Sequence, residues 1–209
     1  MKIKAVIFDI DGVLIDSLGA NAEFFAHFFR SIGHRRFSKS KYAEFNHMTM
    51  FDIIKNLGPT KSTASVRKLW RAAKKFPYPF DLVKVPSNAV STVKSLSRLY
   101  RIGVVTSRVR ASAADILNRY GFKRFVKVVV GFEDFRHPKP HPQPLRVALR
   151  RLKIKPREAV YVGDTETDLL SAKAAGVIAV YFANRKHKLA DYHVSSFGQL
   201  ADILRKYAG

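Results

Sequence analysis

Acidic side chains are scarce in this chain, and several of them gather at two places. The sequence holds 16 Asp and Glu residues against 38 Lys and Arg. Asp9 and Asp11 follow an apolar run near the N-terminus, and Asp164 and Asp168 follow another apolar run later in the chain. Carboxylates brought together need a cation, and oxygen ligands without His or Cys favour Mg²⁺. The acidic residues therefore indicate a magnesium site.

A hydroxyl pair and a lysine complete the set of residues that could do chemistry. Thr106 and Ser107 end another apolar run, and Lys139 lies in a proline-rich loop, HPKPHP. A bound Mg²⁺ with a lysine and a hydroxyl suits a phosphoryl group, whose transfer needs chiefly positioning and charge neutralisation. A carboxylate can attack phosphorus and carry it as an acyl phosphate. These residue types indicate phosphoryl chemistry.

The elements that must position these residues can be read from the apolar runs. Runs of strand character, separated by helix-length segments, cover residues 3–10, 102–106, 126–130, 159–162 and 177–182. This alternation predicts an α/β fold with a doubly wound parallel sheet and crossover helices. Ligands bind at the carboxyl ends of the strands in such a sheet, so the polar residues after the runs should converge there.

One long segment interrupts the alternation. More than 90 residues separate the first two runs, and within them Phe24, Phe25, Phe28 and Phe29 recur at helical spacing. We interpret this phenylalanine stripe as core packing rather than as a ligand cage. The expected organisation is an α/β core of residues 1–15 and 81–209 with a small all-helical domain, residues 16–80, inserted after the first strand.

Four motifs in order relate the chain to a known family. They are DIDGV at 9–13, TS at 106–107, KPHP at 139–142 and GDTETD at 163–168. In these motifs the sequence resembles the haloacid dehalogenase-like superfamily over essentially its whole length. The helical insertion is similar to the cap of the phosphoglycolate phosphatase and β-phosphoglucomutase branch. The resemblance implies a Rossmann-like core.

The resemblance also implies the two catalytic residues. Asp9 would be the nucleophile and become an aspartyl phosphate. Asp11 would protonate the leaving oxygen and then activate the hydrolytic water, and its main-chain carbonyl would bind the metal. Dehalogenases of the family lack this second acid, so Asp11 favours phosphate chemistry over halide displacement.

The remaining site residues follow from the same motifs. Thr106, Ser107 and Lys139 would hold the phosphoryl oxygens. The expected Mg²⁺ ligands are Asp9, Asp11, Asp164 and Asp168, where Asp168 would support the metal or its waters, or pair with Lys139. A structural alternative stays open for Asp168, because Thr165 and Asp168 also have the spacing of a helix-capping box.

The expected function is a Mg²⁺-dependent phosphatase acting on a small phosphomonoester, with phosphoglycolate as the first candidate by resemblance. A phosphomutase on the same core is an alternative. Another is a nucleic-acid-associated protein, because the net charge is +22 and such an excess attracts anions. We favour general anion steering over a nucleic-acid interface, since no nucleic-acid-binding motif accompanies the charge.

The composition excludes several other classes of protein. Cysteine is absent, which excludes disulfide frameworks, thiolate zinc sites and a cysteine nucleophile. No apolar run approaches the ~18 residues of a membrane span, and the start MKIKAVIFDIDG lacks the apolar stretch of a signal peptide. We therefore expect a cytoplasmic protein with no membrane partner. The sequence gives no indication of an oligomeric state.

Overall fold

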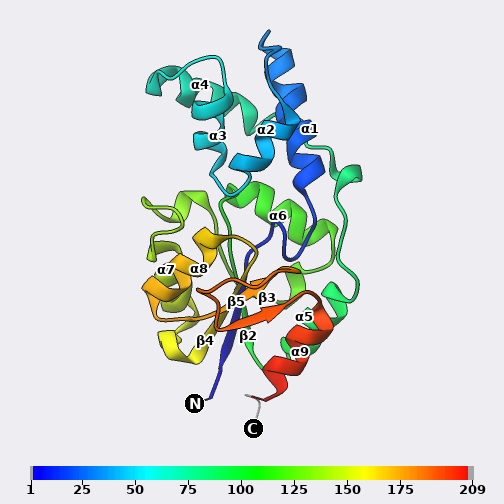
Figure 1. Cartoon of the computed structure of the whole chain (residues 1–209), viewed down its shortest axis with the longest axis vertical. Helices are drawn as coiled ribbons and strands as arrows, with labels where there is room; N and C mark the ends of the chain where they lie inside the picture. The colour runs from blue at the N-terminus through cyan, green and yellow to red at the C-terminus, as the bar shows by residue number, and fades with distance from the viewer. Residues whose placement is uncertain (1, 207–209) are drawn as a thin grey trace. The chain divides into compact units, whose positions relative to one another are not determined.

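The computed structural model describes residues 2–206 and divides the chain into two compact units (Figure 1). The larger unit comprises Met1–Ile15 and Val85–Gly209, and the smaller unit comprises Asp16–Lys84. The sequence-based division lay between residues 80 and 81, and residues 1 and 207–209 of the expected core lie outside the described residues.

A six-stranded parallel sheet forms the centre of the larger unit, in the order β3-β2-β1-β4-β5-β6. The strands are β1 (Ala5–Phe8), β2 (Arg101–Val105), β3 (Val126–Val130), β4 (Ala159–Gly163), β5 (Ile178–Phe182) and β6 (Tyr192–Val194). Its helices are α5 (Ala89–Leu96), α6 (Arg110–Arg119), α7 (Gln143–Leu152), α8 (Glu166–Ala175) and α9 (Phe197–Arg205). Single 3₁₀ turns are η3 (Lys123–Phe125), η4 (Phe132–Asp134) and η5 (Pro156–Glu158).

Helices cover both faces of this sheet. In Figure 1, α7 and α8 lie on one side of the strands, and α5 and α9 lie on the other. The central strand β1 is buried on both faces: Ile7 packs in the cluster with α7 and α8, whereas Phe8 stacks on Phe197 of α9. A strand buried on both sides reads as a continuous apolar run. The expected doubly wound, Rossmann-like α/β fold is confirmed.

The strands differ from the sequence prediction at their ends. Strand β1 spans four residues, because the chain turns after Phe8 and the Ile10 amide donates to the Asp9 side chain. Strand β6 was not predicted. It has three residues at the edge of the sheet and carries no apolar run.

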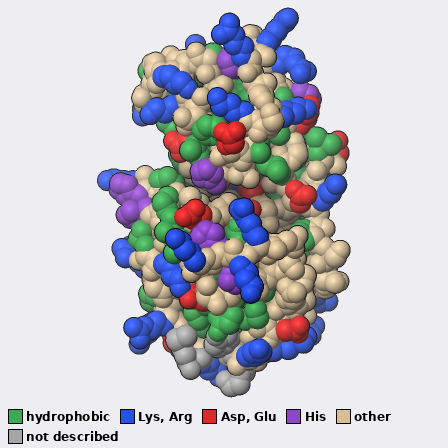
Figure 2. All heavy atoms as spheres, in the orientation of Figure 1, with side chains coloured by type: hydrophobic (Ala, Val, Ile, Leu, Met, Phe, Trp, Pro, Cys, Tyr) green, Lys and Arg blue, Asp and Glu red, His purple; other side chains and the backbone are tan. Residues whose placement is uncertain are grey.

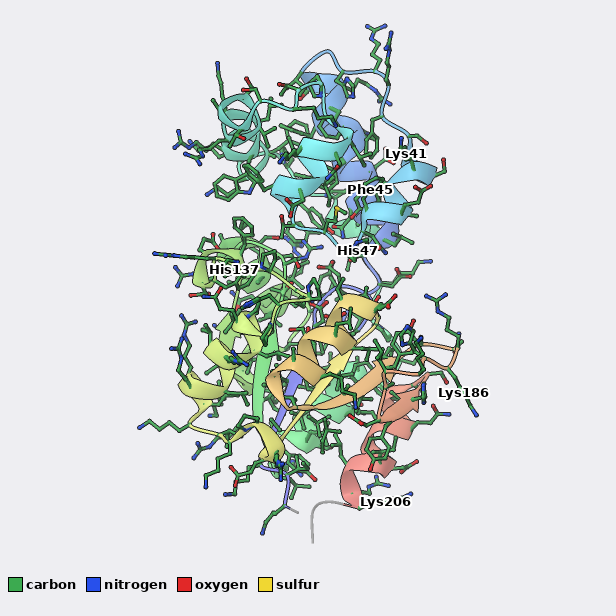
Figure 3. The ribbon with its side chains drawn as sticks, turned by 60° about the vertical axis from the view of Figure 1, so that its left-hand side comes forward. Lys41, Phe45, His47, His137, Lys186 and Lys206 are labelled. Atoms are coloured by element: carbon green, nitrogen blue, oxygen red, sulfur yellow. The ribbon has the colours of Figure 1, made fainter. Side chains whose placement is uncertain are left out.

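The smaller unit is helical. Its elements are α1 (Leu18–Ser31), α2 (Lys39–Tyr42), η1 (Ala43–Phe45), α3 (Met50–Leu57), α4 (Thr63–Ala73) and η2 (Phe80–Leu82). The phenylalanine stripe of α1 forms its core, as expected: Phe28 and Phe29 are fully buried, and the rings of Phe24 and Phe28 stack 6.4 Å apart. Figure 3 shows Phe45 and Lys41 of the neighbouring α2–η1 segment.

The two ends of the smaller unit pair with each other. The Asp16 amide donates to the Lys84 carbonyl at 2.8 Å, and the Lys84 amide donates to the Asp16 carbonyl at 3.0 Å. This isolated antiparallel bridge carries the unit to Lys84, beyond the predicted end at residue 80.

Basic side chains are distributed widely over the surface. Figure 2 shows Lys and Arg scattered over the visible face of both units, with acidic side chains between them. Within residues 2–206, no helix has the length and apolar character that crossing a membrane requires.

Candidate active site

The turn after β1 brings two loops of the sheet together. The Asp9 amide donates to the Val162 carbonyl at 2.9 Å, which extends the pairing of β1 with β4 by one residue. Gly12 follows with φ +76°, and a Cβ on it would lie 2.0 Å from a carboxylate oxygen of Asp164. Only glycine tolerates both the left-handed backbone and this close approach. The DIDG motif thus places the loop after β1 against the loop after β4.

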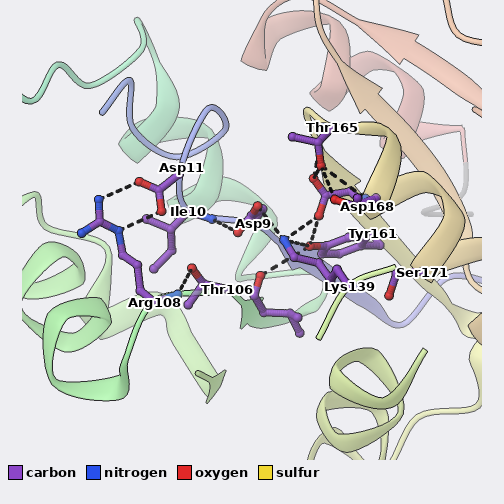
Figure 4. A network of polar contacts seen from close by, with 12 residues as sticks. Asp9, Ile10, Asp11, Thr106, Arg108, Lys139, Tyr161, Thr165, Asp168 and Ser171 are labelled. Atoms are coloured by element: carbon purple, nitrogen blue, oxygen red, sulfur yellow. Dashed lines mark hydrogen bonds and ion pairs between the residues drawn. The ribbon is translucent and has the colours of Figure 1, made fainter. Parts of the chain in front are cut away.

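Lys139 lies at the centre of a buried polar network (Figure 4). Its Nζ donates to Asp9 Oδ2 at 2.8 Å, to Asp168 Oδ1 at 2.6 Å and to the Tyr161 hydroxyl at 3.2 Å. An ammonium group has three donors, and its side chain here is 5% exposed. The network fixes Lys139 between Asp9, which follows β1, and Asp168 in the first turn of α8.

Asp168 joins this network to the start of α8. Thr165 caps the helix, and its amide and hydroxyl donate to Asp168 Oδ2 at 3.1 and 2.6 Å. The Tyr161 hydroxyl donates to Asp168 Oδ1 at 2.8 Å. A Cβ on Gly163 would lie 2.3 Å from the Cβ of Asp168, so glycine makes room for this carboxylate. The capping box and the pairing with Lys139 are both present, and they engage both oxygens of Asp168.

Three carboxylates of the site could hold a divalent metal ion. Asp9, Asp164 and Asp168 each offer one oxygen, and these oxygens lie within 4.8 Å of one another. Burial raises the pKa of Asp9 to about 7; the Lys139 charge opposes the rise and the nearby carboxylates add to it. Burial and the charges of Asp168, Asp9 and Asp11 raise the pKa of Asp164 well above its usual value, and the charge of Lys139 opposes this rise. A bound divalent cation would offset the burial and mutual repulsion of these carboxylates. Their oxygen donors suit a hard cation such as Mg²⁺.

The charges of Lys139 and Asp168 stabilise each other. Burial alone would lower the pKa of Lys139, but the charges of Asp168 and Asp9 outweigh it and raise that pKa. Burial would likewise raise the pKa of Asp168, but Lys139 and the hydroxyl donors hold that pKa below its usual value. The pair is therefore ionised at neutral pH.

The hydroxyl pair lies at the end of β2. Thr106 is buried, and its amide donates to the Val130 carbonyl at 3.0 Å. Its Oγ1 accepts a hydrogen bond from the Arg108 amide at 3.2 Å. Ser107 is the next residue and is half-buried. Because β2 is parallel to β1 and next to it in the sheet, these residues lie at the carboxyl ends of the strands, as Asp9 does.

An ion pair at Asp11 was not foreseen from the sequence. Arg108 Nε donates to Asp11 Oδ2 at 2.8 Å, and Nη2 donates to Oδ1 at 2.7 Å. The side chains of Arg108 and Asp11 are 10% and 30% exposed. One indication of a role for Arg108 was present in the sequence: it follows Thr106 by two residues, in a loop expected at the carboxyl ends of the strands.

Tyr161 was also missed, because it lies within a run that reads only as a buried strand. Its hydroxyl contacts both Lys139 and Asp168. The histidines that flank Lys139 in sequence, His137 and His141, place their rings 4.8 Å apart. Neither belongs to the metal-competent group found among the described residues.

Comparison with known proteins places this geometry in a family context. A model described as haloacid dehalogenase-like hydrolase matches residues 6–182. The chain is 30% identical over 179 residues to pyrophosphatase PpaX of Bacillus thuringiensis, covering 84% of this chain and 81% of the relative.

Two solved structures extend the comparison. A HAD-superfamily hydrolase of subfamily IA from Geobacter sulfurreducens is 29% identical with a TM-score of 0.77, covering 97% of this chain and 100% of the other. A predicted phosphoglycolate phosphatase from Haemophilus somnus has a TM-score of 0.82 at 20% identity, covering 97% and 98% of the two chains. The second likeness shows the fold alone.

Proposed function

Because the chain belongs to the haloacid dehalogenase-like hydrolase family, we propose that it is a Mg²⁺-dependent phosphatase that hydrolyses a small phosphomonoester through a phosphorylated Asp9. Family membership confirms the resemblance read from the four motifs. A relative named as a pyrophosphatase is 30% identical to the chain, which supports a phosphatase as the type of enzyme.

One observation carries the proposal. Lys139 Nζ bridges Asp9 and Asp168 at 2.8 and 2.6 Å, within the aspartate group that could hold a cation. A nucleophile, a cationic phosphate-binding group and metal ligands are the parts that phosphoryl transfer needs. All three come from segments that follow strands of the sheet, Asp168 from the first turn of α8.

Asp9 and Asp11 would share the chemistry of two steps. An Asp9 oxygen attacks phosphorus as the bond from phosphorus to the leaving oxygen breaks, and that oxygen takes a proton from Asp11. Water then attacks the phosphorus of the aspartyl phosphate and gives a proton to Asp11. The bond from phosphorus to Asp9 breaks, which releases phosphate and restores both side chains.

The other residues would bind and orient the phosphoryl group. Thr106, Ser107 and Lys139 would hold its oxygens. Asp9, Asp164 and the main-chain carbonyl of Asp11 would hold Mg²⁺, which supplies charge neutralisation when bound. Asp168 would support this group by fixing Lys139, since both of its oxygens already accept hydrogen bonds.

The substrate class follows from resemblance and charge. A phosphoglycolate-like compound is the first candidate, and the helical unit of Asp16–Lys84 would act as the cap that selects it. Pyrophosphate is a second candidate, because a pyrophosphatase is 30% identical over 179 residues. Both compounds are multiply anionic, which suits a chain of net charge +22.

Phosphate release from a panel of compounds tests the proposal. The panel contains 2-phosphoglycolate, pyrophosphate, ethyl phosphate and p-nitrophenyl phosphate, each with Mg²⁺, with Ca²⁺ and with excess EDTA. We expect turnover with Mg²⁺ and inhibition by Ca²⁺, whose larger and looser coordination misplaces the nucleophile. Full activity in excess EDTA would contradict the metal requirement, and phosphate release from no compound would contradict the function.

A further inference from the structure

Tyr161 is a buried residue of β4 whose hydroxyl meets two charged groups of the site (Figure 4). The hydroxyl donates to Asp168 Oδ1 at 2.8 Å and accepts from Lys139 Nζ at 3.2 Å. A phenol keeps its single proton at neutral pH. The Val105 carbonyl, 3.4 Å away, is the weaker acceptor for that proton, because Asp168 is both closer and charged. The four motifs do not include Tyr161.

Four donors from the described residues fill the acceptor positions of the Asp168 carboxylate. A carboxylate offers about four lone-pair positions, two on each oxygen. The amide and the hydroxyl of Thr165 donate to Oδ2, whereas Tyr161 and Lys139 donate to Oδ1. Because Tyr161 takes one of the two positions on Oδ1, Asp168 accepts a single N–H of Lys139.

The same contacts limit how Lys139 uses its three N–H groups. Nζ, Asp168 Oδ1 and the Tyr161 hydroxyl oxygen form a triangle with sides of 2.6, 2.8 and 3.2 Å. Seen from Nζ, the two oxygens are separated by an acute angle, which is narrower than the tetrahedral angle between two N–H bonds. One N–H therefore serves both oxygens as a three-centre bond, and a second serves Asp9 Oδ2 at 2.8 Å. Within residues 2–206, the third N–H has no acceptor of its own.

A phosphoryl oxygen is the acceptor that the mechanism proposed above supplies for this third N–H. We propose that Tyr161 is a positioning residue, which holds the ammonium of Lys139 in an orientation that keeps one N–H for the transferred phosphoryl group. This inference rests on the proposed function and adds to it a residue that acts through Lys139. Without the hydroxyl, Asp168 Oδ1 gains an open acceptor position and Nζ gains room to move, so the third N–H is no longer held in place.

A matched control lies on the neighbouring strand. Tyr181 of β5 is 1% exposed, as Tyr161 is, and both belong to the same apolar cluster. The Tyr181 hydroxyl accepts from Arg185 Nε at 3.1 Å. Tyr161→Phe and Tyr181→Phe therefore each remove one hydroxyl from a buried tyrosine of the same core, but only the first removes a contact with Lys139.

The primary experiment compares turnover of ethyl phosphate and p-nitrophenyl phosphate, with Mg²⁺, by the wild type and both variants. Tyr161→Phe should lower kcat/KM by about tenfold to a hundredfold, the cost of a misplaced group. The factor should be the same for both substrates, because Lys139 contacts the phosphoryl group that they share. Tyr181→Phe should leave kcat/KM close to that of the wild type. Thermal unfolding checks that each variant is folded.

A double-mutant cycle shows whether Tyr161 acts through Lys139. Lys139→Gln keeps a hydrogen-bond donor for Asp168 but removes the ammonium, and Tyr161→Phe is made in both backgrounds. A positioning residue has nothing to position once the ammonium is gone. Tyr161→Phe should therefore cost much less activity towards p-nitrophenyl phosphate in the Lys139→Gln background, whereas a purely structural role would give the same factor in both.

Inhibition by inorganic phosphate is a second measurement, which decides the question if Lys139→Gln is inactive or does not fold. It is followed through turnover of p-nitrophenyl phosphate. Tyr161→Phe should weaken the inhibition by about tenfold, the size of one hydrogen bond to a charged group. Tyr181→Phe should leave the inhibition unchanged.

The outcomes separate the two proposals. If Tyr161→Phe keeps the activity and the phosphate inhibition of the wild type, or loses activity by the same factor with and without Lys139, this inference is overturned while the phosphatase function stands. The same holds if Tyr181→Phe lowers turnover as much as Tyr161→Phe does. If the wild type releases phosphate from none of the compounds in the panel, the proposed function fails and this inference fails with it.

Discussion

At the scale of single residues, the charged side chains of the site are stabilised by hydrogen bonds and ion pairs with one another. Asp9 is buried with Lys139 on one oxygen and the Ile10 amide on the other. An amide in place of its carboxylate keeps the shape of the side chain and an acceptor for the Ile10 amide, but removes the proposed nucleophile. Lys139 would keep Asp168 as an anionic partner at 2.6 Å. Chemistry and folding can therefore be tested separately at Asp9.

We predict that Asp9→Asn lowers kcat by at least about a thousandfold, because removal of a nucleophile leaves only binding and electrostatic contributions. Steady-state phosphate release measures the loss. Circular dichroism and thermal unfolding should show a folded protein. Acid quench of the wild type should trap the phosphoryl group on Asp9. Turnover within tenfold of wild type would rule out Asp9 as the nucleophile.

Asp11→Asn should impair both proton transfers, each worth roughly 10²–10⁴-fold. A good leaving group needs little protonation, so p-nitrophenyl phosphate should recover much of the first step and little of the second. Rapid acid quench measures formation of the phosphoenzyme, and steady-state turnover measures its hydrolysis. If formation slows equally for p-nitrophenyl phosphate and ethyl phosphate, Asp11 is not the acid.

At the scale of elements, strand topology made part of the site predictable. Asp9, Thr106 and Asp164 follow strands of one parallel sheet, so their convergence could be derived from the sequence. Strand topology does not predict in which direction a loop side chain points. For this reason the contact between Arg108 and Asp11 could not be predicted from the sequence. Strand β6 escaped prediction because three edge residues give too short a pattern to identify.

The loop after β3 is held by one carboxylate. Asp134 Oδ2 accepts from the Gly131 amide at 2.9 Å, and Oδ1 accepts from Arg151 Nη2 of α7 at 2.6 Å. Arg151 Nη1 also donates to the Val129 carbonyl of β3 at 3.2 Å. Burial alone would raise the pKa of Asp134, but the hydrogen bonds from Arg151 and Gly131 outweigh it and lower that pKa.

Asp134→Asn should therefore lower the free energy of unfolding at pH 7 by about 1–3 kcal/mol, because the Gly131 amide and the Arg151 guanidinium lose a charged acceptor. A carboxyl whose folded pKa is depressed contributes stability above its unfolded pKa of about 3.9. That contribution is lost as the pH falls through the folded pKa. The difference between wild type and variant should then shrink below about pH 4. Urea unfolding at several pH values measures it, and a difference independent of pH would exclude the carboxylate charge as its cause.

At the scale of the whole molecule, the net charge of +22 acts at longer range than any single pair. Basic side chains are scattered over the visible face rather than gathered in one patch (Figure 2). Exposed charge of this kind raises the local concentration of anions and is screened over about 8–10 Å near physiological ionic strength. The pair of Arg108 and Asp11 is partly buried, with side chains 10% and 30% exposed, and is screened less than exposed charges.

Raising ionic strength should consequently lower kcat/KM for 2-phosphoglycolate more than for ethyl phosphate. Part of the preference should persist at high salt, because the Arg108 side chain is only 10% exposed and its charge is screened less than those of exposed side chains. Measurement of both substrates at low and high salt gives the ratio directly. An unchanged ratio would show that the basic surface does not steer substrate. A salt titration of nucleic-acid affinity would then test the alternative, since binding to several phosphates gives a steep log–log slope.

The bridge between Asp16 and Lys84 has a consequence for how such proteins diversify. Its two reciprocal hydrogen bonds, 2.8 and 3.0 Å long, bring the entrance and exit of the inserted segment to one place. A segment that starts and finishes at the same point can be lengthened, shortened or exchanged without shifting the strands on either side. Chimeras that exchange this segment between relatives should be joined at these two residues, so that the sheet keeps its own sequence.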